Sequence, residues 1–222
     1  MTDILVIFIK WPEPGMVKTR IGRVLGHDKA AKLYRYMVSR VIENLSPLLT
    51  QGQGMKICWY FDSISKTREV KNWIKNEMYA LNINDLSNQI FCHQVGSDLG
   101  EKLQFVFNKY LSEGFDRVLA IGSDCITISD KIILEAFESI GRRNELVFGP
   151  CSDGGYYLVG MNDFRASLVF DGVPWSTGHV LETSLMIAQK NQLGVTLLEE
   201  LNDLDSPQDL EKSRINLFDF EC

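Results

Sequence analysis

The sequence contains few histidines and no paired cysteines. Its three histidines, His27, His93 and His179, share no spacing that is typical of a metal site. Its five cysteines are odd in number, and no two of them are spaced as C-x-x-C. Free cysteines inside apolar runs, such as Cys58 and Cys92, behave as small hydrophobic residues. The composition therefore favours a reduced, cytoplasmic protein over a disulfide framework.

Several catalytic and targeting signatures are also missing. The sequence has no G-x-S-x-G nucleophile elbow, no Walker A loop and no Rossmann fingerprint, which argues against hydrolase, P-loop and dehydrogenase functions. The apolar residues 4–9 lack the basic flank and the cleavage site of a signal peptide. No apolar run approaches the roughly 18 residues that span a bilayer, so we expect no membrane span.

Positive charge is in the minority. The 222 residues include 29 acidic and 23 basic side chains, which gives a formal net charge of −6. An acidic surface argues against broad nucleic-acid binding, because that function requires a basic footprint. An anionic ligand must therefore meet a local cluster of cations, backbone amides or a metal ion.

The hydrophobic pattern alternates between strands and helices. Apolar runs predict strands at residues 4–9, 55–61, 89–93, 117–121, 145–149, 156–160 and 195–198. Apolar residues at helical spacing predict helices over residues 28–45, 70–81 and 178–190, and further helices that begin at Asp98 and after Ser129. Glu101 predicts a capping box with Asp98. A last helix begins at Pro207.

This alternation predicts an α/β fold with a mixed, mostly parallel central sheet. The strands on either side of residues 150–155 are close enough to form an antiparallel pair, which makes the sheet mixed. No internal repeat or linker is evident, so we expect one domain over residues 1–222. Open α/β sheets bind ligands at the carboxyl ends of their strands. Three unusual segments follow predicted strands and are expected there.

The first segment, residues 10–20, combines two prolines, a glycine and three cations. Lys10, Lys18 and Arg20 lie within eleven residues of an otherwise acidic chain. Such a cluster suits a phosphate group, because arginine makes bidentate contacts and lysine supplies a point charge. A solvated surface loop is an equally good interpretation of the spacing alone.

The second and third segments supply carboxylates. Asp124 follows the strand at residues 117–121, where an oxygen ligand for Mg²⁺ or a simple turn cap are both reasonable. Asp153 precedes Gly154 and Gly155 in what is either an ordinary tight turn or a place of close backbone approach to a ligand. In the second case Asp153 faces the acceptor or the metal.

Two later features are less specific. Trp175 precedes a helix and is either an aromatic wall beside a bound ligand or a packed residue at a helix start. Asp203 and Asp205 precede the helix at Pro207, which Asp205 or Ser206 caps. Either aspartate could also supply a second carboxylate to a metal.

Six segments, taken in order, resemble one bacterial family. They are residues 8–20, 96–101, 121–125, 149–160, 174–177 and 203–210. Their combination is similar to the glycosyltransferase-like family called radical-SAM/selenodomain-associated transferase 1, and the resemblance covers nearly the whole chain. Ile126 stands where that family often has proline, and residues 205–209 depart slightly from its late motif. Neither departure removes a proposed ligand.

The resemblance implies the GT-A fold of the nucleotide-diphospho-sugar transferase superfamily, a three-layer α/β/α arrangement. It implies a nucleotide over the loop after the first strand, and Mg²⁺ or Mn²⁺ held by the aspartate after a central strand. The residues expected at the nucleotide are Lys10, Pro14, Gly15, Lys18, Arg20 and Ser123. Those expected at the metal are Asp124 and Asp205. Gly154, Gly155 and Trp175 are expected on the acceptor side.

Three functions are compatible with these expectations. The first is metal-dependent sugar transfer from a nucleotide-diphospho-sugar, with Asp124 and Asp153 as catalytic residues. The second is guanylyl or cytidylyl transfer with release of pyrophosphate, which the lysine-rich first loop favours. The third is nucleotide binding without turnover. The sequence leaves the base, the sugar, the acceptor, the metal and the oligomeric state open.

Overall fold

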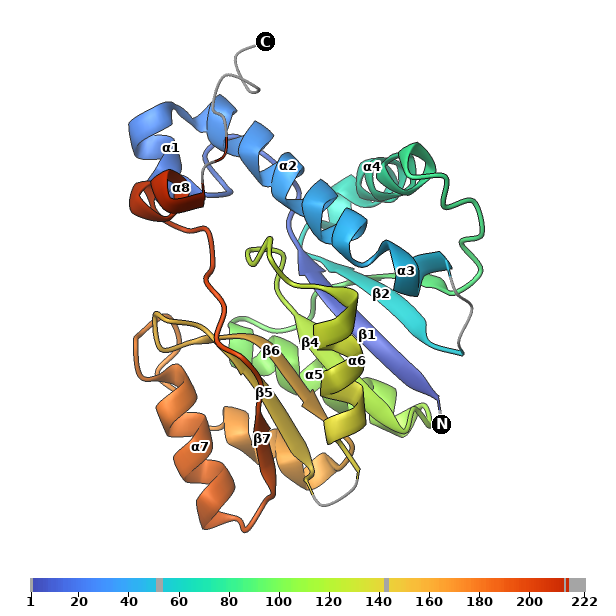
Figure 1. The fold of residues 1–222 in the computed structure, drawn as a ribbon, viewed down its shortest axis with the longest axis vertical. Helices are drawn as coiled ribbons and strands as arrows, with labels where there is room; N and C mark the ends of the chain where they lie inside the picture. Colours follow the sequence, from blue (N-terminus) through green and yellow to red (C-terminus); the bar gives the residue numbers. More distant parts are fainter. Residues whose placement is uncertain (1, 51–53, 142–143, 214, 216–222) are drawn as a thin grey trace.

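The buried run at the start of the chain forms an inner strand of a seven-stranded sheet (Figure 1). The computed structural model describes residues 2–50, 54–141, 144–213 and 215. Its strands are β1 (Asp3–Ile9), β2 (Lys56–Phe61), β3 (Gln89–His93), β4 (Arg117–Ile121), β5 (Leu146–Pro150), β6 (Tyr156–Met161) and β7 (Val195–Leu197).

Helices connect and cover these strands. The α-helices are α1 (Thr19–Leu25), α2 (His27–Asn44), α3 (Ser46–Thr50), α4 (Thr67–Ala80), α5 (Leu99–Ser112), α6 (Asp130–Ser139), α7 (Val180–Lys190) and α8 (Pro207–Ser213). Two 3₁₀ segments are η1 (Ile64–Lys66) and η2 (Phe164–Phe170). None of the described helices has the length and apolar character that crossing a membrane requires.

The sheet is mixed and mostly parallel, as the sequence predicts. Its strand order is β3-β2-β1-β4-β6-β5-β7. Strands β1, β2, β3 and β4 run parallel to one another, and β5 runs parallel to β7, whereas β6 runs antiparallel to both β4 and β5. The carboxyl ends of β1 and β4 therefore lie side by side at one edge of the sheet.

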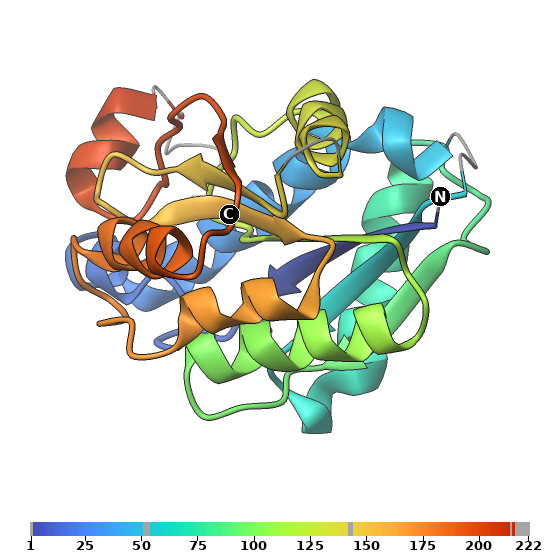
Figure 2. The same ribbon diagram turned by 90° about the horizontal axis from the view of Figure 1, so that it is seen from below.

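Helices cover both faces of the sheet, because its central strands are apolar on both sides. Figure 2 shows α5 on one side of the sheet and α6 on the other. Successive residues of β1 alternate between two cores: Leu5 and Ile7 pack with α2 and α6, whereas Ile4 and Val6 pack with α5 and η2. This is the expected three-layer α/β/α arrangement.

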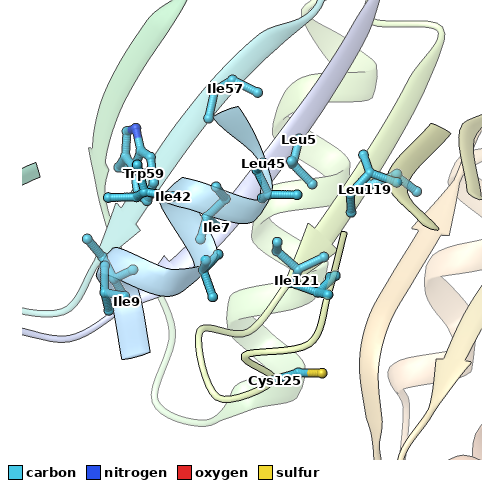
Figure 3. Close-up of a cluster of buried hydrophobic side chains, with 14 of the residues drawn as sticks. Leu5, Ile7, Ile9, Ile42, Leu45, Ile57, Trp59, Leu119, Ile121 and Cys125 are labelled. Atoms are coloured by element: carbon cyan, nitrogen blue, oxygen red, sulfur yellow. The ribbon is translucent and has the colours of Figure 1, made fainter. Parts of the chain in front are cut away.

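The first of these cores lies under α2. Figure 3 shows Ile42 of α2 beside Ile7, Ile9 and Trp59 of the sheet, with Cys125 lower in the same cluster. These apolar residues of α2 recur at the helical spacing that is visible in the sequence. Packing of this face fixes the position of α2 over the carboxyl end of β1.

Several helix ends form as expected. The Asp98 side chain accepts a hydrogen bond from the Glu101 backbone, and Ser129 accepts one from Ile132. The Glu101 carboxylate, however, accepts from the backbone of Ser97 and not from Asp98, so the expected capping box is displaced by one residue. At α8, Ser206 and Asp209 cap one another.

No helix is predicted between the first strand and residue 28, but the structure contains one there. Residues from Thr19 onward form the short helix α1, which Lys18 precedes. The helix packs Ile21 into a small apolar cluster with Leu204 and Leu210 of the late segment, residues 203–210. Its apolar residues are too few to show a helical period, so tertiary packing decides the conformation. Helix α3 and segment η2 also escape sequence patterns for this reason.

We expect the substitution Ile7→Ala to lower the free energy of unfolding by about 2–5 kcal/mol, because Ile7 is fully buried at the centre of the sheet and its loss leaves a cavity. Chemical denaturation measures this change. The matched control is Ile64→Ala, since Ile64 is 71% exposed and its truncation should change stability by less than about 0.5 kcal/mol. Equal effects of the two substitutions would contradict the described core.

Candidate functional site

The carboxyl ends of β1 and β4 open into a cavity of 490 Å³. It lies where open α/β sheets bind their ligands. Charged and polar lining residues include Lys10, Lys18, Arg20, Tyr34, Gln94, Lys102, Ser123, Asp124, Asp203 and Asp205. Residues 10–20 and 121–125 thus meet at one cavity, and Tyr156 and Tyr157 of the third segment and Asp203 and Asp205 of the late segment join them.

Lys18 joins these segments through two ion pairs. Its Nζ lies 2.7 Å from Oδ1 of Asp124 and 2.5 Å from Oδ1 of Asp205. The Lys18 side chain is only 4% exposed, whereas the two carboxylates are 41% and 49% exposed. Burial disfavours the charged ammonium, but the charges of Asp124 and Asp205 outweigh it and raise the pKa of Lys18.

The backbone of Lys18 is unusual as well. It has φ 44° and ψ 45°, the left-handed region that residues with a side chain rarely adopt. This conformation turns the chain from the first loop into α1 and delivers the ammonium to the carboxylates. The ion pairs offset the conformational cost, which is on the order of 1–2 kcal/mol.

The late segment is held beside β4 by its backbone and by one leucine. Leu204 donates a backbone hydrogen bond of 3.0 Å to the carbonyl oxygen of Asp124. Its side chain is buried with Ile21 and Leu33. Asp203 and Asp205, on either side of Leu204, are thereby placed at the cavity.

Asp203 is a buried carboxyl group with an unsatisfied oxygen. Its Oδ1 is buried and accepts a hydrogen bond from none of the described residues. Burial raises the pKa of Asp203 to about 7, and the charges of Asp124 and Asp205 act in the same direction. Three carboxyl groups therefore share a small region in which Lys18 is the paired cation.

A buried tyrosine, Tyr34, also lines the cavity. The Tyr34 hydroxyl accepts a hydrogen bond of 2.9 Å from the backbone of Lys10 and lies 2.8 Å from Oγ of Ser123. Burial raises the pKa of Tyr34 well above its usual range, so the hydroxyl stays protonated. Through this group, α2 ties the end of β1 to the end of β4.

A second cavity of 410 Å³ adjoins the first. Arg20, Asp203 and Asp205 line both cavities, and Asp153 lines the second one. The Asp153 carboxylate accepts a hydrogen bond of 2.9 Å from the backbone of Gly155. Asp153 thus holds its own turn and also faces a space next to the carboxylate cluster.

Five predicted site residues lie away from both cavity linings. Pro14 and Gly15 belong to the first loop but line neither cavity. Gly154, at φ +86°, lies against the backbone of Gly178, where a side chain would collide. Trp175 packs against Gly100 and the ring of Phe170. Gly154 therefore lies in a tight turn, and Trp175 is a packed aromatic residue. Gly155 lines neither cavity. The roles of Gly154, Gly155 and Trp175 on the acceptor side stay predictions.

The residues present suit a metal that is shared with a ligand. No group of three or more His, Cys, Asp or Glu side chains in the described part of the chain is arranged to hold a metal by itself. Asp124 and Asp205 nevertheless converge on one cation, the Lys18 ammonium, and the unsatisfied oxygen of Asp203 is near their charges. Mg²⁺ commonly uses one or two carboxylates together with substrate phosphates. The carboxylate set fits that mode.

Comparison with known proteins agrees with this architecture. A family model described as "Uncharacterized protein conserved in bacteria (DUF2064)" matches residues 70–177, somewhat less than half of the chain. Among curated proteins, none matches the sequence. The crystal structure of a candidate nucleotide-diphospho-sugar transferase from Desulfovibrio desulfuricans is similar over 99% of this chain and 94% of its own, with 28% identity and a TM-score of 0.83.

More distant structures share the fold. A cytidylyltransferase from Leptospira borgpetersenii has 11% identity and a TM-score of 0.55, with 99% of this chain and 92% of its own covered. Glucosyl-3-phosphoglycerate synthase from Mycobacterium tuberculosis, solved with Mn²⁺ and UDP, has 13% identity and a TM-score of 0.52, with 95% and 73% covered. The fold is therefore that of nucleotide-diphospho-sugar transferases, and the neighbours support a transferase.

Some residues of the site were not identified from the sequence. In the sequence, Tyr34 is only one of the apolar positions of the helix over residues 28–45, because hydrophobic spacing does not show where a hydroxyl group points. Gln94 directly follows β3, and Lys102 lies in the first turn of α5. They line the cavity because β3 ends and α5 begins beside it. The sequence indicates Asp203 as a possible metal ligand, but it does not show that the side chain of Asp203 is buried.

We expect Tyr34→Phe to lower the free energy of unfolding by about 1–3 kcal/mol, because the backbone amide of Lys10 then loses its acceptor in a part-buried position. Thermal and chemical denaturation test this. Tyr79→Phe is the matched control, since Tyr79 is 48% exposed and should tolerate the change within about 0.5 kcal/mol. No loss in Tyr34→Phe would contradict the hydrogen-bond network.

The substitution Asp203→Asn should make stability less dependent on pH. A carboxyl group whose pKa is raised from 3.8 to about 7 on folding lowers the stability progressively as the pH rises through this interval. Asparagine removes this effect. In EDTA, the free energy of unfolding of Asp203→Asn relative to that of the wild type should rise by about 2 kcal/mol between pH 4 and pH 8, after allowance for solvent screening.

Urea denaturation at these two pH values measures the gain. The control is Asp171→Asn, an exposed aspartate outside the cavities, which should show no comparable gain. A constant difference between Asp203→Asn and the wild type at both pH values would show that the carboxyl group is not perturbed.

Proposed function

We propose that this chain is a metal-dependent glycosyltransferase that uses a nucleotide-diphospho-sugar donor. One observation carries the proposal: two aspartates from distant parts of the chain, Asp124 and Asp205, meet on a single cation at the carboxyl end of the sheet. The adjoining cavity is large enough for part of a sugar nucleotide and is lined by further cations. The resemblance to the Desulfovibrio desulfuricans protein supports the same function.

The donor phosphates are expected between the first loop and the carboxylate cluster. Lys10 and Arg20 line the cavity and can neutralise phosphate oxygens, and Ser123 can donate a hydrogen bond to them. Mg²⁺ or Mn²⁺ at Asp124 and Asp205, when bound, would stabilise the negative charge that develops on the diphosphate leaving group. This placement keeps the phosphates near the end of β4.

The acceptor is expected in the second cavity. That cavity shares Arg20, Asp203 and Asp205 with the first, so a molecule bound there lies next to the donor's phosphate end. Asp153 lines the second cavity but not the first, and it can orient or deprotonate an acceptor hydroxyl. Because Asp153 also accepts from Gly155, its position is fixed by its own turn.

Nucleotidyl transfer is the second candidate. The observation that favours it is the number of cations at the first cavity, where Lys10, Lys18, Arg20 and Lys102 could neutralise a triphosphate. In that reaction a phosphorylated substrate attacks the α-phosphate, and pyrophosphate leaves. The same residues would serve both reactions, so the products must separate them.

The finer expectations from the sequence belong to the same proposal. They are membership of the radical-SAM/selenodomain-associated transferase 1 family, one domain over residues 1–222 and a cytoplasmic location. The DUF2064 match and the transferase neighbours support the wider superfamily.

The proposal predicts metal-dependent nucleotide binding that requires Asp124. Nucleoside diphosphates, triphosphates and sugar nucleotides are screened by thermal shift with Mg²⁺, with Mn²⁺ and with EDTA. A ligand at 100 times its Kd should stabilise the protein by about 2.7 kcal/mol, which corresponds to a rise of roughly 5–10 °C for a chain of this size. Asp124→Asn should abolish the metal-dependent part, whereas Asp171→Asn should retain it.

Product analysis then separates the two reactions. Release of a nucleoside diphosphate from a sugar nucleotide supports glycosyl transfer, and release of pyrophosphate from a triphosphate supports nucleotidyl transfer. Unchanged metal-dependent binding in Asp124→Asn would contradict the metal assignment. Tight binding without turnover across a broad acceptor panel would favour a nucleotide-binding module.

A further inference from the structure

The ammonium group of Lys18 lies against the two carboxylates that are proposed to hold the metal. Its Nζ contacts one oxygen of Asp124 at 2.7 Å and one oxygen of Asp205 at 2.5 Å. Asp124 and Asp205 are the residues that would hold the proposed metal. A divalent cation held by these two carboxylates would compete with the Lys18 ammonium for them.

We propose that Lys18 is a tethered cation that occupies the metal position in the nucleotide-free protein and excludes divalent metal until the phosphates of the donor draw the ammonium away. The inference rests on the proposed function, because it assigns the metal to Asp124 and Asp205. It adds an order of events: free metal binds weakly, and metal and nucleotide bind cooperatively.

The surroundings of Lys18 favour this role over a passive ion pair. Its side chain is 4% exposed, and it is paired with two carboxylates that are each more than one-third exposed. The carboxylates thus remain accessible from the cavity while the cation between them is covered. A ligand approaching from the cavity meets acidic groups that are already neutralised.

Lys18 also has a route to a second position. It lines the first cavity together with Lys10 and Arg20, where the donor phosphates are proposed to bind. A lysine has a flexible four-carbon stem, and its ammonium can exchange a carboxylate for a phosphate oxygen by rotation of the side chain. Entry of a metal with the nucleotide would supply both the replacement cation and the new anionic partner.

The carboxylate cluster explains why a resident cation is needed. Asp124, Asp203 and Asp205 line the same cavity, and Oδ1 of Asp203 is buried without a hydrogen-bond partner among the described residues. Without Lys18, these groups would repel one another and would attract any available cation. The structure therefore leads to a specific expectation for a variant that lacks the ammonium.

The test is titration of Mn²⁺ alone into nucleotide-free protein. Calorimetry measures the heat of binding, and electron paramagnetic resonance measures the concentration of unbound Mn²⁺. We expect Lys18→Met to bind one Mn²⁺ at least about tenfold more tightly than the wild type, which is within the usual range of coupling between two ligands. Mn²⁺ should also raise the melting temperature of Lys18→Met more than that of the wild type. The double variant Lys18→Met/Asp124→Asn should lose the gain.

Arg20→Met is the matched control. It removes one positive charge from the same cavity and leaves the contacts of Asp124 and Asp205 with Lys18 in place. Its affinity for Mn²⁺ should rise by less than about threefold, which is the size of a nearby charge effect in water. Circular dichroism verifies folding, and Lys18→Gln replaces Lys18→Met if the latter does not fold.

Equal Mn²⁺ affinity in Lys18→Met and the wild type, or an equal gain in Arg20→Met, would overturn the inference. The nucleotide screen described above is independent of this result. Tighter Mn²⁺ binding by Lys18→Met with no nucleotide binding by the wild type would retain the tethered cation and reject the transferase proposal. Metal-dependent nucleotide binding with no effect of Lys18→Met would do the reverse.

Discussion

The ion pairs of Lys18 connect three parts of the chain that are far apart in sequence. The lysine ends the first loop, Asp124 follows β4, and Asp205 belongs to the last described segment. Each carboxylate alone would be a minor surface charge. Together with Asp203 they form an acidic cluster that is tolerable only because a cation is placed within it. Much of the geometry around the cavity can be understood as the support of this arrangement.

That support comes from apolar packing as much as from polar contacts. Helix α2 lies over the carboxyl end of β1 because its apolar face matches the sheet, and this position brings the Tyr34 hydroxyl to Lys10 and Ser123. A separate apolar cluster joins α1, α2 and the late segment through Ile21, Leu33 and Leu204. The backbone bond from Leu204 to Asp124 then sets the spacing of the carboxylates. The arrangement of the site therefore depends partly on residues that line neither cavity, such as Ile21, Leu33 and Leu204.

Most of the fold could be predicted because its signals are local. The strand at residues 4–9 is a continuous apolar run, and the strands at residues 89–93 and 117–121 have apolar stretches beside polar end residues. Helix α2 shows a helical period over eighteen residues. Helix α1 is not visible in the sequence, because its seven residues, Thr19–Leu25, carry no comparable period. The antiparallel β5–β6 pair follows from the short turn between the two strands. Gly154, within that turn, lies against the backbone of Gly178 and lines neither cavity.

The sequence by itself determined the α/β class, the mixed and mostly parallel sheet, and the charged residues at the ends of its strands, because these follow from hydrophobic period and from the common edge of parallel strands. Which charges meet was decided only by the tertiary structure. Lys18 was expected at phosphates, yet in the folded chain it lies between Asp124 and Asp205. The burial of Asp203 and the direction of the Tyr34 hydroxyl likewise arise from side-chain packing across long sequence separations. A one-dimensional pattern carries no information on those distances, and electrostatic interactions depend on them directly.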